Sequence, residues 1–464
     1  MPPDPRSAVA RRVFWVLAVA SIVTLTWMGR GLTFFSDEWA FITSRSLTGP
    51  ATWWAPHNEH WSTIPVLAYR ALVETVGLRS YVPYLLVIAV LHALVAWLVF
   101  RAVERRAEPT VALGAGSIVL FFGAGFENLY WGFQVGFVGS MVAGLVALDA
   151  LDGAPSGRRA VVVVVALLVA VMTAGVGTLF VGASGVLMLA TPAWRRWLWT
   201  LAIPTGAYLT WFLLAGHSGV GTFRDPLTLS SITAIPRFLV DGFEAALVGA
   251  TGLSTLGPLL VIGAAVLAGV GGARGHRPSP RVIALVAAIA AEYALIAVTR
   301  AGVTEGQAGY PRYTYVSGIL MVQVIALTAG PANSRFRAWA AANPTRWRRL
   351  AALAAVPVSL AVPLVWNMNL LLAGREVFLE RAALTRALVA ESLRPDPPAE
   401  ADLARDLILV PSPIVIRQLV AAHGSPLGDA ILPWAVEPIP ESLRAEARRR
   451  LVEGPPIPLP EDVE

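Results

Sequence analysis

The stretch Val82–Phe100 reads VPYLLVIAVLHALVAWLVF and contains no Asp, Glu, Lys or Arg. An α-helix needs about 20 predominantly apolar residues to cross a hydrocarbon core of about 30 Å. Arg101, Arg105 and Arg106 follow the stretch directly, which is typical of a transmembrane helix that ends at the cytoplasmic surface. The stretch therefore predicts a helical membrane protein.

The composition of the whole chain favours the same fold class. Its 464 residues are 56% hydrophobic and 14% charged, whereas soluble domains average about 25% charged residues, which argues against a soluble cytosolic enzyme. The absence of cysteine excludes disulfides, thiolate zinc sites and a cysteine nucleophile. The net charge is +6, the chain has no lysine, and its arginines gather at the ends of apolar runs. This pattern indicates contact with membrane lipids and argues against a nucleic-acid partner.

Comparable apolar runs recur along the chain and predict an all-α polytopic membrane protein with about 11 transmembrane helices. The predicted spans are Val13–Met28, Val82–Phe100, Val111–Gly125, Gln134–Leu148, Ala160–Thr173, Val176–Ala190, Trp197–Leu214, Ala245–Val270, Val282–Val298, Tyr313–Thr328 and Leu350–Leu372. No small-residue cleavage site follows the first run, so we expect a retained helix and not a signal peptide. Thr173–Gly175 predicts a tight turn or a break between two short helices.

The loops between these runs alternate in arginine content. About 18 arginines fall on one side and about 8 on the other, the C-terminal tail excluded. The rich side comprises Arg6, Arg11 and Arg12, Arg101, Arg105 and Arg106, Arg158 and Arg159, Arg195 and Arg196, Arg274, Arg277 and Arg281, and Arg335–Arg349. The positive-inside rule then puts the N-terminus inside and the C-terminus outside. We expect a multi-pass protein of the plasma (inner) membrane.

Two parts of the chain are expected. Residues 1–372 form a transmembrane domain with a long first outer loop, residues 30–81. Residues 373–464 are rich in proline and form a small extracytoplasmic segment that rests on it. Residues 215–244 are a further long outer loop, and Thr43–Trp54 is expected to be a short helix on the outer leaflet. Long loops on a rigid scaffold are where function tends to lie.

The first outer loop opens with two adjacent acids, Asp37 and Glu38, between aromatic residues. Adjacent acids repel each other, which raises the pKa of one of them unless a cation lies nearby. A partly desolvated carboxylate next to the bilayer suits a general base or a metal ligand. The alternative is that both are solvated acids beside an aromatic belt.

The same loop continues with Trp53-Trp54-Ala55-Pro56-His57-Asn58-Glu59-His60-Trp61. Imidazole and carboxylate groups bind zinc or manganese and also transfer protons, although the spacing differs from that of a helical zinc motif. The tryptophans offer flat faces for a sugar ring or for anchoring at the interface. The sequence favours a polar site here and leaves the role of a metal open.

Other polar residues lie near the predicted outer surface. Glu127 sits in a short turn where an unpaired charge is costly, so it is expected to face a cavity or an arginine. Arg312, between Tyr310 and Tyr313, suits a phosphate or pyrophosphate, with a snorkelling interfacial arginine as the alternative. Further polar residues of this loop are Arg300, Glu305 and Gln307.

Two ionisable residues are predicted near mid-depth. His92 is expected to make a hydrogen bond between helices. Glu292 requires a partner, a cavity or protonation, and is the feature that a proton or ion pathway would use.

The first span, the acidic pair that opens the long outer loop, the arginine and tyrosines at a late outer helix end, and the external tail together resemble the GT-C superfamily of integral-membrane glycosyltransferases. The resemblance covers the architecture of Val13–Leu372. It implies transfer of a sugar from a polyprenyl-phosphate donor to an extracytoplasmic envelope glycan, lipid or protein, with inversion, and makes residues 1–372 the catalytic domain. The first-loop acid Asp37 would be the general base, and Arg312 would hold the lipid phosphate.

The resemblance also assigns roles to the residues around these two. Glu38 would join Asp37 in the catalytic site. His57, Glu59, His60, Trp61, Glu127, Arg300 and Tyr313 would bind substrate. Asp37, Glu38, His57 and His60 are the candidate ligands if a divalent cation, Mg²⁺ or Mn²⁺, takes part. A transporter or flippase and a non-catalytic envelope-assembly protein are the alternative functions.

Overall fold

A computed structural model of the chain describes residues 5–46, 48–219, 229–275, 277–300, 306–342, 346–397 and 410–453. Within these ranges the chain is helical and has no β-strand, apart from an isolated bridge between His57 and His60. The all-α prediction is therefore confirmed. The helices are α1 Pro5–Met28, α2 Asp37–Thr43, α3 Pro50–Trp54, α4 Thr63–Thr75, α5 Val82–Glu104, α6 Pro109–Leu120, α7 Glu127–Tyr130, α8 Val135–Leu151, α9 Gly157–Val171, α10 Val176–Ala190, α11 Ala202–Leu214, α12 Leu229–Thr251, α13 Gly257–Ala273, α14 Pro280–Arg300, α15 Pro311–Ala342, α16 Arg346–Ser392, α17 Pro413–His423 and α18 Glu441–Glu453. Short 3₁₀ turns join several of them, among them η1 Gly123–Gly125, η2 Gly132–Gln134 and η3 Pro192–Leu201.

Six helical segments of the described chain are long and apolar enough to cross a membrane. They are Pro5–Met28, Val82–Glu104, Gly132–Leu151, Pro192–Leu214, Ser254–Ala273 and Pro280–Val298. Pro109–Gly125 and Val176–Ala190 are shorter apolar stretches. These segments support a membrane protein with several spans.

The predicted span Ala245–Val270 is wrong, because the chain breaks inside it. Gly252 has φ 72°, a left-handed conformation that glycine adopts without a steric penalty. As a result α12 ends at Thr251 and α13 begins only at Gly257. The residues predicted as an outer loop, 215–244, contain most of α12.

Two other predicted boundaries also shift. The expected interfacial helix Thr43–Trp54 is divided between the end of α2 and the whole of α3. The expected domain boundary at residue 372 falls inside α16, a continuous helix of 47 residues that is about 70 Å long. By contrast, the predicted turn at Thr173–Gly175 does separate α9 from α10.

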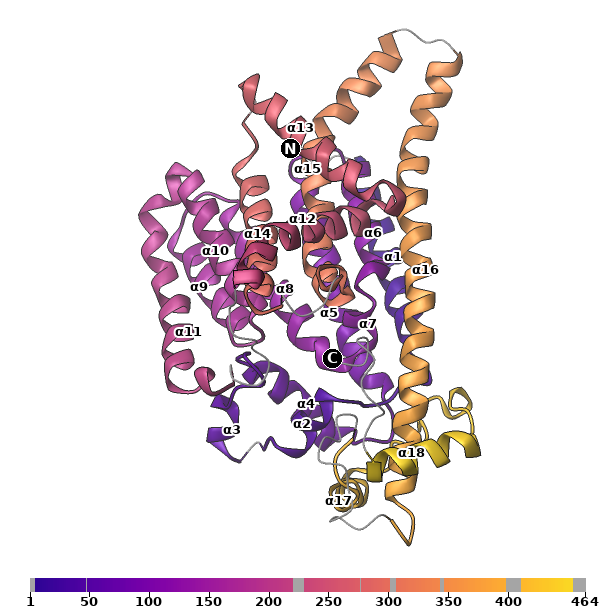
Figure 1. Ribbon diagram of the computed structural model, residues 1–464. Coiled ribbons are helices and arrows are strands. Elements are labelled where there is room, and N and C mark those ends of the chain that lie inside the picture. The colour runs from indigo at the N-terminus through magenta and orange to yellow at the C-terminus, as the bar shows by residue number, and fades with distance from the viewer. Residues whose placement is uncertain are drawn as a thin grey trace.

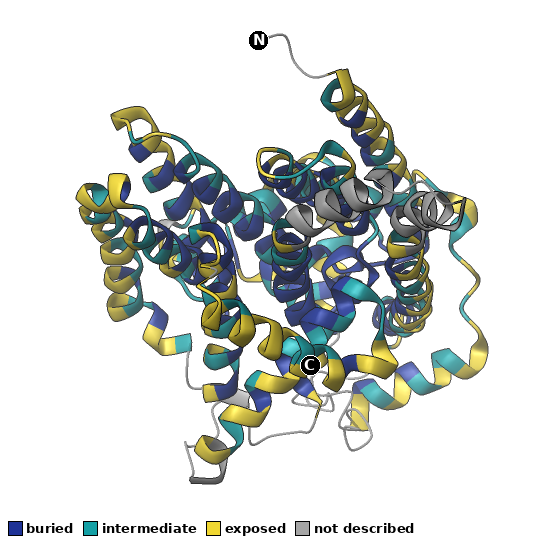
Figure 2. Cartoon of the chain, turned by 90° about the horizontal axis from the view of Figure 1, so that it is seen from above, coloured by how far each residue is buried: buried dark blue, intermediate teal, exposed yellow. Residues whose placement is uncertain are grey.

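The core lies between tightly packed helices. α5 packs against α1, α6 and α8, while α14 packs against α10, α12 and α15. Figure 2 shows buried residues gathered at the centre and exposed residues on the outward faces. Large aliphatic side chains are among the exposed ones, for example Val19, which is 60% exposed, and Leu267, which is 75% exposed. Such apolar outer surfaces are expected where lipid covers the protein.

The arginine-rich ends of α5 and α14 meet at the end of α8. Asp152 has a buried side chain and lies 2.5 Å from Arg106 Nη2, 3.0 Å from Arg281 Nη1 and 3.5 Å from Arg105 Nη1. Arg105 also pairs with Asp149 at 2.7 Å. We call these five residues the inner clamp. It joins three helices at the end of the bundle that the sequence predicts to be cytoplasmic.

The C-terminal segment rests on the first outer loop. Arg386, on the extension of α16, donates hydrogen bonds to Gly31 O at 2.7 Å and Leu32 O at 3.1 Å. Leu78 N donates to His423 O at 2.9 Å, at the end of α17. In Figure 1 the helices α2, α3, α4, α17 and α18 gather at the lower end of the bundle, and the N-terminus lies toward the upper end.

Candidate functional site

Asp37 and Glu38 begin α2 after a strained residue. Ser36 has φ 52° and ψ −126°, a backbone conformation that is rare for residues other than glycine and that gathers at functional sites. Successive residues of a helix point about 100° apart, so the two acids face different surroundings. The side chain of Asp37 is 33% exposed, whereas Glu38 is fully buried.

Asp37 lies beside an imidazole that aromatic rings hold in place. Its Oδ1 is 3.2 Å from Nε2 of His57. The His57 ring lies 4.9 Å from the Phe41 ring and 5.0 Å from the Phe133 ring. The backbones of His57 and His60 exchange hydrogen bonds of 3.1 and 2.9 Å across a turn in which Asn58 has φ 48°. The result is an accessible carboxylate next to a rigidly placed histidine.

Glu38 is enclosed by hydrogen-bond donors. One carboxyl oxygen accepts from the hydroxyls of Tyr69 and Tyr81, and the other accepts from Phe35 N at 2.9 Å. Gly132 N in turn donates to the Tyr81 hydroxyl at 2.6 Å. The pKa of Glu38 is raised to about 8, as expected for one of the adjacent acids, but burial is the main cause and repulsion by Asp37 is the smallest contribution. This geometry gives Glu38 a positioning role, since it fixes the first turn of α2.

The backbone of η2 comes very close to this carboxyl group. A Cβ atom at Gly132 would lie 2.6 Å from Glu38 Oε1, which is closer than a Cβ atom can come without displacing its neighbour. A glycine is therefore needed here for η2 to pack against α2.

Arg312 lies beside α7, the short helix that precedes η2. Its Nη1 is 3.5 Å from Glu127 Oε1, so the prediction that Glu127 faces a cavity or an arginine is borne out by the arginine. The guanidinium lies 5.5 Å from the Tyr310 ring and 5.4 Å from the Tyr313 ring. Trp131 N donates to Glu127 O at 3.1 Å, so little more than one helical turn separates Glu127 from Gly132.

Sequence reasoning missed Arg381. Its guanidinium carbon is 5.8 Å from the Phe35 ring and 5.3 Å from the Phe378 ring, and it makes no hydrogen bond or ion pair with the described residues. Phe35 directly precedes the turn at Ser36. Phe378 lies 6.2 Å from Tyr130 of α7, so Arg381 borders the loop and α7 together. The signal was the absence of a proline after Leu372 until residue 395, which allows α16 to continue.

The remaining first-loop residues differ in exposure. Trp61 is 4% exposed, with its ring stacked at 5.4 Å on Trp211 and 5.7 Å from Trp54. It packs the loop and offers no free face to a sugar, which corrects its expected role in substrate binding. Glu59 is about half exposed and lies 4.0 Å from His60 Nε2.

The expected metal ligands do not converge. Among the residues with described positions, no group of three or more His, Asp or Glu side chains could hold a metal ion. Both Glu38 oxygens face donors, and the His60 ring lies 6.0 Å from Phe137. Asp37 and His57 alone approach each other, so this arrangement offers no ligand set for Mg²⁺ or Mn²⁺.

The other predicted residues have mixed outcomes. His92 Nδ1 lies 2.9 Å from the Tyr315 hydroxyl, so the predicted hydrogen bond between helices is present. Glu292 is 3% exposed, and its Oε2 has no hydrogen-bond partner in the described chain. Tyr313 is buried and stacks on Tyr310. The Arg300 side chain and all of Glu305 lie outside the described residues.

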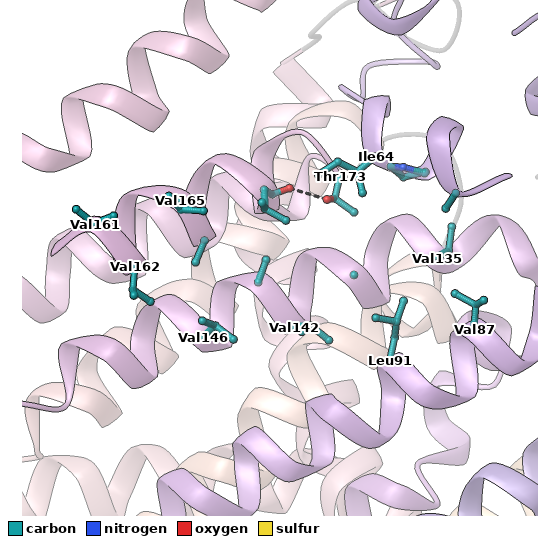
Figure 3. Close-up of a pocket in the computed structure, with 16 residues that line it drawn as sticks. Ile64, Val87, Leu91, Val135, Val142, Val146, Val161, Val162, Val165 and Thr173 are labelled. Atoms are coloured by element: carbon teal, nitrogen blue, oxygen red, sulfur yellow. Dashed lines mark hydrogen bonds between the residues drawn. The ribbon is translucent and has the colours of Figure 1, made fainter. Parts of the chain in front are cut away.

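An apolar groove runs along the bundle from the first outer loop, residues 30–81 (Figure 3). It has a volume of about 550 Å³ and is lined by residues of α4, α5, α8 and α9 with no charged side chain among them. Lining residues include Ile64, Val87, Val142, Val165 and Thr173.

Comparison of the chain with protein-family models, with curated proteins and with solved structures finds no match. An exposed carboxylate backed by a histidine can accept a proton. Guanidinium groups set among aromatic rings can hold an anion with several oxygens.

Proposed function

We propose that this protein is a membrane glycosyltransferase with a GT-C-like arrangement. It would take a sugar from a polyprenyl-phosphate donor and pass it to a hydroxyl of an envelope glycan, lipid or protein. The observation that carries the proposal is the position of Asp37, an accessible carboxylate 3.2 Å from His57. Tyr81 of the same loop accepts a hydrogen bond from Gly132, which lies five residues along the chain from Glu127, the partner of Arg312.

The proposed reaction uses Asp37 as the general base. Asp37 takes the proton of the acceptor hydroxyl while the oxygen attacks the anomeric carbon of the donor sugar. The bond between that carbon and the phosphate oxygen breaks, and the lipid phosphate leaves with the bonding electrons. Attack from the face opposite the leaving group inverts the anomeric centre. His57 keeps the carboxylate oriented.

The arginines would stabilise the leaving group. Negative charge grows on the lipid phosphate as the glycosidic bond breaks, and preorganised cations lower the barrier most at such a point. Arg312 and Arg381 are the candidates, because both border α7. Tyr313 stacks beside Arg312 and would help to fix its position.

The site is proposed to face the extracytoplasmic side of the plasma (inner) membrane. The loop with Asp37 and the C-terminal segment share one end of the bundle, and the inner clamp lies where the arginine-rich loops meet. This arrangement supports the N-inside, C-outside topology. The count of about 11 spans belongs to the same proposal.

The test is sugar transfer by Asp37→Asn and Arg312→Ala in membranes that contain a labelled polyprenyl-phosphate sugar. Loss of a general base lowers the rate by about 10²–10⁴-fold, so we expect transfer by Asp37→Asn to fall by that factor. Glu74→Gln and Arg449→Ala are matched controls, because both change charged surface residues outside the site. Full transfer by both site variants at normal protein levels would refute the proposal.

Glu292 is the observation that favours a transporter as the second candidate. It is buried in α14 without a hydrogen-bond partner for Oε2 in the described part of the chain, and such groups mark ion or proton pathways. A transporter would lose transport in Glu292→Gln and tolerate Asp37→Asn. The glycosyltransferase predicts the opposite pattern, so the two variants in one assay discriminate between them.

A further inference from the structure

The apolar groove and the candidate phosphate-binding arginines belong to different helices. Lining residues come from α4, α5, α8 and α9, whereas Arg312 lies at the start of α15 and Arg381 lies on α16. In Figure 1, α9 and α16 stand on opposite sides of the bundle. A chain bound along α9 would therefore lie away from Arg381, and no lining residue of the groove belongs to α15 or α16.

One end of the groove lies at the end of the first outer loop, where Ile64 and Pro65 line it. Ile64 N donates to Met172 O at 3.2 Å, which joins the end of the first loop to Thr173 at the groove. The turn His57–His60 lies directly before this point, and the His60 ring lies 6.0 Å from Phe137, between the groove residues Val135 and Gly139. His57 in turn lies 3.2 Å from Asp37. A molecule in the groove would present its polar end to the proposed general base.

The lining of the groove suits hydrocarbon and not a charged group. It consists largely of valine and alanine, and Figure 3 shows valine side chains along α8 and α9. Arg70 on α4 is the cation nearest in sequence to the lining residue Ala68, and it is already bound to Glu74 and to Ile42 O. The lining of the groove itself offers a phosphate no positively charged group.

The groove is also open to the membrane. Val161 is 62% exposed and Val165 is 53% exposed, although both line it. A lipid chain can thus enter sideways from the bilayer. Its volume of about 550 Å³ lies within the range of small-molecule pockets, about 300–1,000 Å³.

We propose that the acceptor is a glycolipid, whose hydrocarbon chain occupies the groove between α5, α8 and α9 while its sugar hydroxyl faces Asp37. This inference rests on the proposed function and narrows the acceptor to lipid-linked molecules. The donor would approach Asp37 from the side of Arg312 and Arg381. Two lipid substrates would then meet at one carboxylate from opposite sides.

The test uses two photoreactive probes on the full-length protein in detergent micelles. One is a dialkyl glycolipid with a diazirine in one chain, and the other is a polyprenyl phosphate with a diazirine in its chain. We expect the glycolipid to label groove residues such as Val142 and Val165, and excess unlabelled glycolipid to prevent the labelling. Val165→Trp should reduce labelling at least fivefold, whereas Val19→Trp, at an equally exposed valine of α1, should not.

Three outcomes would overturn the inference. Labelling of the groove by the polyprenyl phosphate would make it the donor site. Equal competition by phosphatidylglycerol would show that the groove binds membrane lipids without selecting the glycolipid. Absence of labelling by the glycolipid would show that the groove does not bind the acceptor. Photolabelling does not require turnover. If the protein fails to transfer sugar, the proposed function is refuted, but the labelling still reports whether the glycolipid binds in the groove. In an active preparation, Val165→Trp should raise KM for the glycolipid without changing KM for the donor.

Discussion

The buried carboxyl groups at the two ends of the bundle have different partners. At the inner end, Asp152 is surrounded by Arg105, Arg106 and Arg281, so its charge is neutralised. At the outer end, Glu38 is just as buried, but hydroxyl and backbone N–H groups are its only hydrogen-bond partners among the described residues. The ion pairs around Asp152 hold helices together, whereas burial without a cation raises the pKa of Glu38 to about 8.

This difference separates stability from function. A neutralised ion-pair network contributes to the fold only while it is complete, because removal of one member leaves a buried charge uncompensated. An acid without an arginine partner, such as Asp37 beside His57, is a better candidate for exchanging a proton. Variants of the inner clamp should therefore change stability and leave turnover intact, whereas variants of Asp37 itself should lower turnover and leave stability intact.

The largest effect on stability is expected from Asp152→Ala. Loss of this carboxylate leaves Arg281, which is 2% exposed, without its ion pair, and breaking a buried pair lowers the free energy of unfolding by about 3–5 kcal/mol. Denaturant titration in detergent measures the change, with Glu376→Ala at an exposed pair as the control. A loss of stability no larger than that of the control would mean that the inner clamp does not stabilise the packing of its helices.

The next effect is a pH dependence that originates at Glu38. Its pKa is 4.5 in the unfolded chain and about 8 in the folded protein, so the folded state binds more protons between these values. Stability should therefore fall as the pH rises from 4.5 to 8, by about 1 kcal/mol per pH unit, and level off above that range. The thermal midpoint of Glu38→Gln should not fall with pH over this range, whereas the thermal midpoint of Glu74→Gln should fall as in the wild type. Parallel slopes in Glu38→Gln and the wild type would assign the pH dependence to other groups.

Local sequence patterns were enough to predict much of the fold. Continuous apolar runs located most helices, and the glycine at the end of Thr173–Gly175 located the turn between α9 and α10. The arginine partner of Glu127 could also be anticipated, because a charge at that depth needs a counter-charge. The break at Gly252 was missed, because a left-handed glycine between apolar segments gives no hydropathy signal.

The candidate site was harder to predict because it depends on contacts between distant segments. Asp37 and Glu38 are neighbours in sequence, and only the approach of Tyr69, Tyr81 and Gly132 decides which of them is enclosed. Trp61 was expected to offer a face for a sugar, but Trp211 of α11 covers it. Pairings of this kind follow from the packing of helices and leave no periodic trace in the sequence.

A smaller effect is expected from Arg381 at the outer end. A hydrogen bond to a charged group contributes about 1.5–3 kcal/mol, so Arg381→Ala should raise KM for the polyprenyl-phosphate donor at least tenfold. Arg381→Lys should recover part of the affinity, because lysine keeps the charge and loses the planar pair of donors. Transfer kinetics at varied donor concentration measure the change. An unchanged KM would leave Arg312 as the candidate and give Arg381 only its contact with Phe35 and Phe378.

The smallest effect concerns a polar contact that belongs to neither end. Tyr315→Phe removes the hydroxyl that lies 2.9 Å from His92 Nδ1 between α5 and α15. Hydrogen bonds between membrane helices contribute about 0.6 kcal/mol on average, because a helix freed from one partner finds another. The same denaturant titration should therefore resolve a small loss of stability, well below that of Asp152→Ala, with normal sugar transfer. A loss as large as that of Asp152→Ala would show that the middle of the bundle, and not the inner clamp alone, fastens its helices.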